Sequence, residues 1–168
     1  MASGFLLVFC LCITMTNALF FPILWHIKHH KPVVHVRGPQ CPHGWTKHGS
    51  RCFIIQNSHA TMAEAECACI GLGGNLASIH QHSELSFIRK LIFKSCHVYQ
   101  SVWIGIFDAI QGGKWLWTDG SKVDYTCWSH GGPHIVGGEH CTVINSNGFS
   151  WNHLSCHNRK PFVCARKL

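Results

Sequence analysis

The sequence predicts an α+β domain held together by disulfides, and three observations carry this prediction. Two segments with helical periodicity come first, at about 61–72 and 83–94. Short apolar segments separated by glycine turns follow from Val102 onward. Of the eleven cysteines, Cys10 and Cys12 lie near the start, and the other nine are dense enough for a disulfide framework. Helices followed by short, mostly antiparallel strands are typical of the α+β class.

Residues 1–18 have the features of a secretory signal peptide. Phe5–Met15 is an apolar stretch of signal length, and small residues at 16–18 permit cleavage after Ala18. A positive charge near the start is missing and apolar residues resume at Leu19, so an uncleaved anchor is the alternative. We favour secretion to the extracellular space, which would place the remaining cysteines in an oxidising compartment.

Residues 19–40 form a His-rich basic arm that precedes the first framework cysteine. His26–Val36 contains four histidines and two lysines beside Pro32. A flexible linker or a removed pro-segment explains this composition. A metal-binding or pH-responsive tail is the alternative.

The charge and motif content exclude several function classes. The formal charge of +7 is spread along the chain without a long Lys/Arg run or a groove-reading motif, so nucleic-acid binding is not predicted. No stable membrane insertion is expected of the mature chain either. Nucleophile-elbow, metalloprotease and P-loop motifs are missing, and Asp108, Asp119 and Asp124 lie beside turns, where Asp usually bonds to the backbone. We therefore predict that the chain is not an enzyme.

The strands are predicted from apolar runs between turns. Cys41–Ile55 resembles a hairpin closed by Cys41 and Cys52, with turn glycines between them. The later strands are expected at Val102–Gly105, Lys114–Trp117, Cys141–Asn145, Phe149–Trp151 and Pro161–Cys164.

The first helix is predicted to begin at a capping box formed by Thr61 and Glu64. Its inward face would carry the residues spaced by three and four positions, Met62, Ala65, Cys69 and Leu72. Cys67 lies two residues from Cys69, about 200° around the helix, and is therefore expected in solvent. This geometry predicts that Cys69 is a core disulfide partner and that Cys67 is the candidate for an intermolecular bond.

The second helix is predicted to start at Ser83 as N-cap. Glu84 in its first turn and Lys90 and Lys94 near its end suit the helix dipole. Its inward residues are expected to be Leu85, Ile88 and either Leu91 or Ile92.

At this point the sequence resembles the C-type lectin-like domain family, over about Cys41 to Ala165. The matching stretches in order are CPHGWTKHGSRCF, GLGGNLASIH, VWIG, WLWTDGS, the pair Cys141 and Cys156, and PFVC. Residues 41–166 are thereby identified as the domain. It is most similar to the small secreted fish members, in the galactose-binding and type II antifreeze branches. The resemblance implies two helices, short antiparallel strands and a long irregular loop region.

The resemblance also implies three disulfides, Cys41–Cys52, Cys69–Cys164 and Cys141–Cys156. A disulfide that closes a long loop stabilises the folded state by about 3–4 kcal/mol. Cys67, Cys96 and Cys127 remain. A Cys96–Cys127 bridge would leave Cys67 for a disulfide-linked homodimer, and a free thiol at Cys67 is the alternative. Met62 stands where the family often has tryptophan, and we expect the fold to tolerate it.

The family's sugar site is a calcium ion held by oxygen ligands, and this chain departs from it. By alignment with the family motifs, the ligand positions fall on Gly132-Pro133-His134, on Glu139, and on Asn152-His153. Of the five positions that supply side-chain calcium ligands in the family, only Glu139 and Asn152 keep the family's residue type. Calcium requires six to eight oxygens, so the sequence predicts that calcium is not held.

Histidine at former ligand positions raises a metal-exchange hypothesis. Imidazole and carboxylate suit zinc, copper or nickel, so His134, Glu139 and His153 are candidate ligands, with His130 or His140 as a further one. The alternative is surface histidines that bind nothing.

The predicted function is recognition of a glycan or glycoprotein in innate defence, independent of calcium. Trp128, Phe149 and Trp151 flank the loop and are candidates to stack on a sugar. Core packing is the alternative for the tryptophans, and the one we favour for Trp103, Trp115, Trp117 and Trp151. A protein ligand and ice binding remain the alternative functions.

Overall fold

Two helices and eight strands make up the computed structural model, which describes residues 38–129, 132–133, 137–144 and 150–168. The predicted signal peptide and residues 19–37 of the predicted arm lie outside the described residues. In chain order the elements are β1 (Thr46–His48), β2 (Arg51–Ala60), α2 (Met62–Gly71), β3 (Asn75–Leu76), α3 (His82–Cys96), β4 (Val102–Phe107), β5 (Leu116–Trp117), β6 (Cys141–Ile144), β7 (Trp151–Leu154) and β8 (Lys160–Lys167).

The strands form one sheet in the order β1-β2-β8-β4-β6-β7, with β3 beside β8 and β5 beside β4. Only the β4–β8 pair, at Trp103 and Phe162, is parallel among the described strands, and every other pair is antiparallel. The predicted α+β class is therefore confirmed. The strand prediction missed the two-residue β3 and the extent of individual strands, since β8 runs the length of β2 and β7 begins at Trp151.

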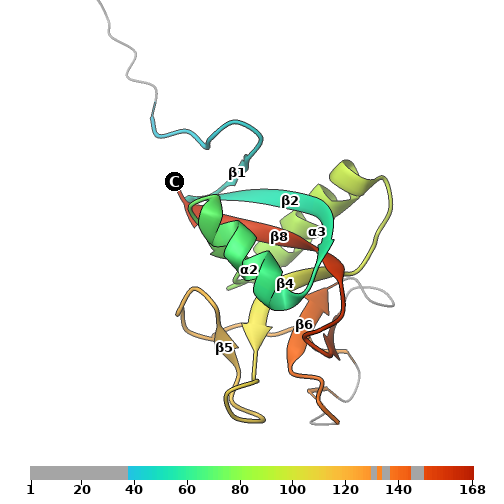
Figure 1. Ribbon diagram of the computed structural model, residues 1–168. Helices are drawn as coiled ribbons and strands as arrows, with labels where there is room; N and C mark the ends of the chain where they lie inside the picture. Colours follow the sequence, from blue (N-terminus) through green and yellow to red (C-terminus); the bar gives the residue numbers. More distant parts are fainter. Residues whose placement is uncertain (1–37, 130–131, 134–136, 145–149) are drawn as a thin grey trace, which may run out of the picture. The chain divides into compact units, whose positions relative to one another are not determined.

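The helices cover opposite faces of the sheet (Figure 1). Strand β4 divides the core, because its side chains alternate between the two faces. Val102, Ile104 and Ile106 join the cluster beneath α3, whereas Trp103 joins the cluster beneath α2. Among the described residues, no helix combines the length and apolar character needed to cross a bilayer.

Helix α2 begins as predicted and ends slightly earlier. The Thr61 hydroxyl accepts from the Glu64 amide at 3.3 Å, and the Glu64 carboxylate accepts from the Thr61 amide at 2.9 Å, which completes the capping box. Met62, Ala65 and Cys69 are buried as expected. The prediction for Leu72 is wrong: this residue is the C-cap and is 40% exposed, because the chain leaves the helix there.

Helix α3 begins earlier than predicted. Its N-cap is Gln81, which makes no capping bond through its side chain, so the assignment of Ser83 as N-cap is wrong. The Glu84 carboxylate instead accepts from the amide of His80, the residue before the N-cap, at 2.8 Å and so fixes the chain that enters the helix. The predicted inward residues Leu85, Ile88, Leu91 and Ile92 are all buried.

All three implied disulfides are present, with Cα–Cα distances of 5.6 Å for Cys41–Cys52, 5.3 Å for Cys69–Cys164 and 5.1 Å for Cys141–Cys156. The helix-face argument is also confirmed, because Cys69 is buried and Cys67 is exposed.

The extra bridge between Cys96 and Cys127 is not formed. The Cys96 thiol instead donates to the Asn57 side-chain oxygen at 2.8 Å.

Candidate functional site

The candidate ligand residues lie next to two strands: Gly132, Pro133 and Glu139 precede β6, and Asn152 and His153 lie on β7. These strands pair antiparallel, with Val143 opposite Asn152 and Thr142 opposite His153. This pairing places Asn152 and His153 of β7 beside β6, the strand that follows Glu139. Glu139 is exposed, and Asn152 and His153 are partly buried. The candidate ligands His130 and His134 lie outside the described residues.

The first former ligand position is closed by its neighbours. Gly132 precedes Pro133 through a cis peptide bond, and Pro133 is exposed. A Cβ added at Gly132 would lie 3.2 Å from the Trp128 Cβ and 3.3 Å from the Ser129 carbonyl oxygen. The loop therefore packs around a residue without a side chain, and a longer ligand side chain would require Trp128 or Ser129 to shift.

His153 occupies another former ligand position and packs against two indoles that also contact each other. Its ring stacks on Trp115 with centroids 4.9 Å apart and meets Trp128 edge-on at 4.7 Å. The two indoles are themselves 4.6 Å apart. An imidazole in this position contributes aromatic packing where the family pattern has a carboxylate or amide oxygen.

The tryptophans divide between the core and the surface. Trp103, Trp117 and Trp151 are at most 3% exposed, so the hypothesis that Trp151 stacks on a sugar is wrong and the core alternative holds for these three. Trp128 packs edge-on against Trp151 at 5.4 Å but stays partly exposed. Trp115 packs against the core but is also partly exposed, so the core prediction for it holds only in part. Trp128 therefore remains available as part of a binding surface. Phe149 lies outside the described residues.

His140, the further metal-ligand candidate, bonds to a buried carboxylate. Its Nδ1 lies 2.9 Å from Asp108 Oδ1, and the second Asp108 oxygen accepts from the Gly113 amide at 2.7 Å. Asp108 is 2% exposed. Asp108 thus holds the turn before β5, as its position beside glycines predicted. Nε2 of His140 is the ring nitrogen not used in this pair.

No group of three or more His, Cys, Asp or Glu side chains among the described residues is arranged to hold a metal ion. Glu139, Asn152 and His153 therefore form an incomplete donor set within the described part of the loop. Two oxygen-bearing side chains cannot replace the hydration shell of calcium.

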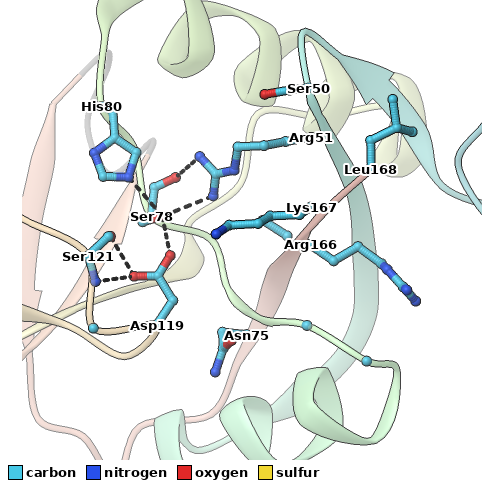
Figure 2. Close-up of a pocket in the computed structure, with 14 residues that line it drawn as sticks. Ser50, Arg51, Asn75, Ser78, His80, Asp119, Ser121, Arg166, Lys167 and Leu168 are labelled. Atoms are coloured by element: carbon cyan, nitrogen blue, oxygen red, sulfur yellow. Dashed lines mark hydrogen bonds between the residues drawn. The ribbon is translucent and has the colours of Figure 1, made fainter. Parts of the chain in front are cut away.

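A second polar site lies where β2 begins and β8 ends (Figure 2). It is an open pocket of about 850 Å³. Basic residues Arg51, Arg166 and Lys167 line it together with Ser78 and Asp119. Sequence inspection did not single out this pocket, because its residues come from segments far apart in the chain.

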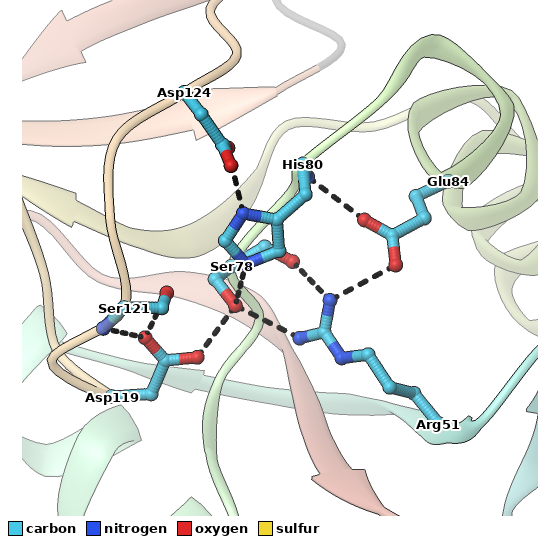
Figure 3. Close-up of polar contacts among 7 residues, drawn as sticks. All are labelled: Arg51, Ser78, His80, Glu84, Asp119, Ser121 and Asp124. Carbon is cyan, nitrogen blue, oxygen red and sulfur yellow. Dashed lines mark hydrogen bonds and ion pairs between the residues drawn. The ribbon is translucent and has the colours of Figure 1, made fainter.

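Arg51 and Ser78, which line this pocket, are also the centre of a polar network (Figure 3). The Arg51 guanidinium donates to the Ser78 carbonyl at 3.0 Å, to the Ser78 hydroxyl at 2.9 Å and to Glu84 at 3.1 Å. The Ser78 hydroxyl donates to Asp119 at 2.5 Å, and His80 Nδ1 lies 2.8 Å from Asp124. These bonds tie β2, the start of α3 and the segment after β5 together.

Two carboxyl groups in this network have altered acidity. Partial burial at the pocket wall acts to raise the pKa of Asp119, although the residue as a whole remains exposed. Hydrogen bonds from Ser121 and Ser78 outweigh that effect, so the pKa lies below its usual value. The hydrogen bond from His80 lowers the pKa of Asp124. Both groups are therefore stabilised as carboxylates.

Comparison with known proteins agrees with this architecture. The model of the lectin C-type domain family matches residues 58–166. The galactose-specific lectin nattectin of Thalassophryne nattereri is 46% identical over 129 residues, which are 76% of this chain and 81% of nattectin. Ladderlectin of Oncorhynchus mykiss is 41% identical over 124 residues, which are 73% of this chain and 65% of ladderlectin.

A solved structure of a calcium-independent type II antifreeze protein superposes on this chain with a TM-score of 0.71 at 34% identity, covering 79% of this chain and 98% of the antifreeze protein. The family match, the relatives and the shared disulfide framework lead to one conclusion: the chain belongs to the C-type lectin domain family.

Proposed function

We propose that this chain is a secreted recognition module that binds carbohydrate without calcium and has no enzymatic activity. The support for a carbohydrate ligand is the family and, within it, a relative named as a galactose-specific lectin. Galactose is therefore the first sugar to test. Secretion is supported by the signal-like residues 1–18 and by three disulfides of the kind found in oxidising compartments.

The observation that carries calcium independence is the packing of His153 against Trp115 and Trp128. A ligand position filled by a stacked imidazole has no oxygen to offer a hard cation. The closed space at Gly132 removes a second position. The sugar would then be held by the partly exposed face of Trp128 and by hydrogen bonds from side chains such as Asn152.

The test is retention of the mature protein on immobilised galactose, and then on a glycan array, in EDTA and in millimolar calcium. We expect equal binding in both buffers. The Glu139→Gln variant separates the two mechanisms: it should leave binding intact if calcium is not involved, whereas it would abolish binding through a calcium ion. Binding that appears only with calcium, and disappears in Glu139→Gln, would contradict the proposal.

A bound transition metal is the alternative form of this site, with His134, Glu139 and His153 as ligands. Because the His153 ring contacts two indoles, coordination there should change tryptophan fluorescence. Zinc titration of EDTA-stripped protein tests it, with His153→Phe as the variant that keeps the ring packing and removes the ligand. If neither fluorescence nor melting temperature responds to zinc, this form of the site is ruled out.

Ice binding is the second candidate function. It is favoured by the likeness to a calcium-independent type II antifreeze protein. Thermal hysteresis of the purified protein measures it directly. A freezing-point depression with no glycan binding would favour ice over sugar, and a protein ligand is the remaining alternative if both assays are negative.

We further propose that the recognition unit is a disulfide-linked homodimer through Cys67. The thiol is exposed on α2, and Ile70, one turn further on, is 57% exposed beside it. Exchange with a disulfide such as oxidised glutathione would join two Cys67 thiols and release two molecules of reduced glutathione. Two linked sites would strengthen binding to multivalent glycans.

Non-reducing electrophoresis of the mature protein tests the dimer. We expect a band of twice the monomer mass that Cys67→Ser removes and Cys96→Ser leaves unchanged. A monomeric native protein, or a dimer that survives Cys67→Ser, would contradict the assignment.

A further inference from the structure

An exposed aromatic and basic surface lies at the C-terminal end of α3. We call it the α3 tip and define it by Arg89, Lys90, Phe93, Lys94, Val98 and Tyr99. Phe93 is 47% exposed, Val98 55% and Tyr99 59%, and Lys90 and Lys94 are exposed beside them. Large apolar side chains that gather in solvent and are surrounded by polar ones mark an interaction surface.

The tip is a defined arrangement rather than a loose end of the helix. His97 ends α3 in a left-handed conformation with φ of 60°, and its amide donates to the Phe93 carbonyl. This turn returns the chain so that Tyr99 stacks on Phe93 with ring centroids 4.8 Å apart. The Arg89 guanidinium lies 5.9 Å from the Tyr99 ring centroid. The apolar and cationic groups are therefore held together.

The two lysines of the tip, Lys90 and Lys94, have no acidic partner among the described residues. Glu84, in the first turn, is the one acidic residue of α3, and it is buried and paired with Arg51. Five of the other six carboxylates are held elsewhere in the domain by hydrogen bonds or ion pairs, namely Glu64, Glu66, Asp108, Asp119 and Asp124. The sixth, Glu139, lies in the loop before β6. Lys90 and Lys94 form no ion pair with any described residue.

We propose that the α3 tip docks the protein on an anionic lipid surface. Lys90 and Lys94 would meet the phosphate headgroups, while Phe93, Val98 and Tyr99 enter the boundary between headgroups and acyl chains. The rings of Phe93 and Tyr99 stack on each other, so fewer ring faces remain to stack on a sugar. Val98 has neither an aromatic ring nor a hydrogen-bonding group with which to bind a sugar. This pattern favours lipid over an acidic glycan.

The association would be peripheral and reversible. Leu85, Ile88 and Leu91 of α3 are buried in the core, so the helix itself does not enter the bilayer and only its tip makes contact. Headgroup attraction is screened by salt, and binding should therefore weaken as ionic strength rises. The proposal uses none of the candidate sugar-binding residues, so docking does not depend on the carbohydrate proposal.

The test is co-sedimentation of the mature protein with vesicles of phosphatidylcholine containing phosphatidylglycerol, against pure phosphatidylcholine. We expect binding to the anionic vesicles alone. Lys90→Glu with Lys94→Glu should lower the partition coefficient by about tenfold or more, and Phe93→Ser with Tyr99→Ser should lower it several-fold. All of these side chains are exposed, and an unchanged melting temperature checks that each variant is folded.

Matched controls change charge and apolar exposure elsewhere. Lys114→Glu with Lys122→Glu makes the same charge change at two exposed sites, and Ile110→Ser removes an apolar side chain that is 76% exposed. Both should keep most of the binding. The proposal is overturned if anionic vesicles do not bind the protein, or if the controls lose as much as the tip variants. Heparin retention of the same variants tests an acidic glycan as the ligand. The proposal is also overturned if the tip variants lose heparin binding but keep vesicle binding.

Discussion

Asp108 places a carboxylate inside the domain, and its two oxygens are bonded to His140 and to the Gly113 amide. Removing it would leave both donors without their acceptor and open a small cavity. We therefore expect Asp108→Ala to lower the free energy of unfolding by about 2–4 kcal/mol in urea denaturation. Lys122→Ala, at an exposed site, is the control and should change it by less than about 0.5 kcal/mol. A loss for Asp108→Ala as small as that of the control would show that the pair is not structural.

Asp119 makes acid stability depend on the Arg51 and Ser78 network. Its pKa is lowered in the folded state, so its contribution is present above the unfolded pKa, near 3.8, and is lost as pH falls through the lower folded value. Asp119→Asn should therefore be less stable at neutral pH and lose less stability than the native protein below about pH 4. Urea midpoints measured from pH 7 to pH 2 check this, and parallel pH curves for the two proteins would refute it.

Single residues also mark where inference from the sequence stops. Replacement of calcium ligands at Gly132 and His153 follows from residue identity alone. The packing of His153 against Trp115 and Trp128 does not, because those indoles come from other segments and meet only in the fold. The Arg51 network was missed for the same reason, since Ser78 lies 27 residues from Arg51 and 41 from Asp119.

At the scale of elements, local patterns predicted what local physics controls. The capping box of α2 and its buried residues Met62, Ala65 and Cys69 follow from helical spacing. The start of α3 was misplaced because a tertiary contact contributes to it: Glu84 bonds to the His80 amide before the helix and pairs with Arg51 on β2. The serine near the helix start does not reveal these contacts.

These two helix starts give a matched pair of substitutions. Thr61→Ala removes a hydroxyl that accepts from the Glu64 amide and should cost about 1 kcal/mol of folding free energy. Ser83→Ala should cost less than about 0.5 kcal/mol, because α3 is not capped by Ser83. Chemical denaturation of both variants measures the difference. Equal losses would mean that Ser83 caps the helix in solution.

At the scale of the whole molecule, the disulfides differ in how much chain they enclose. Cys69–Cys164 spans 95 residues and Cys41–Cys52 spans 11. In the chain-entropy model, replacing the first pair by alanine should cost about 4–5 kcal/mol and replacing the second about 2–3 kcal/mol. Urea unfolding of the two double variants tests this order. A larger loss on removing Cys41–Cys52 would show that local strain or packing outweighs loop entropy.

The alternation of side chains along β4 has a further consequence for how the domain melts. The strand packs against both core clusters: Ile104 belongs to the cluster beneath α3, and Trp103 belongs to the cluster beneath α2. Neither half of the interior can lose its packing without removing the support of the other. Heating should therefore produce one cooperative transition, in which indole fluorescence and far-ultraviolet dichroism change at the same temperature.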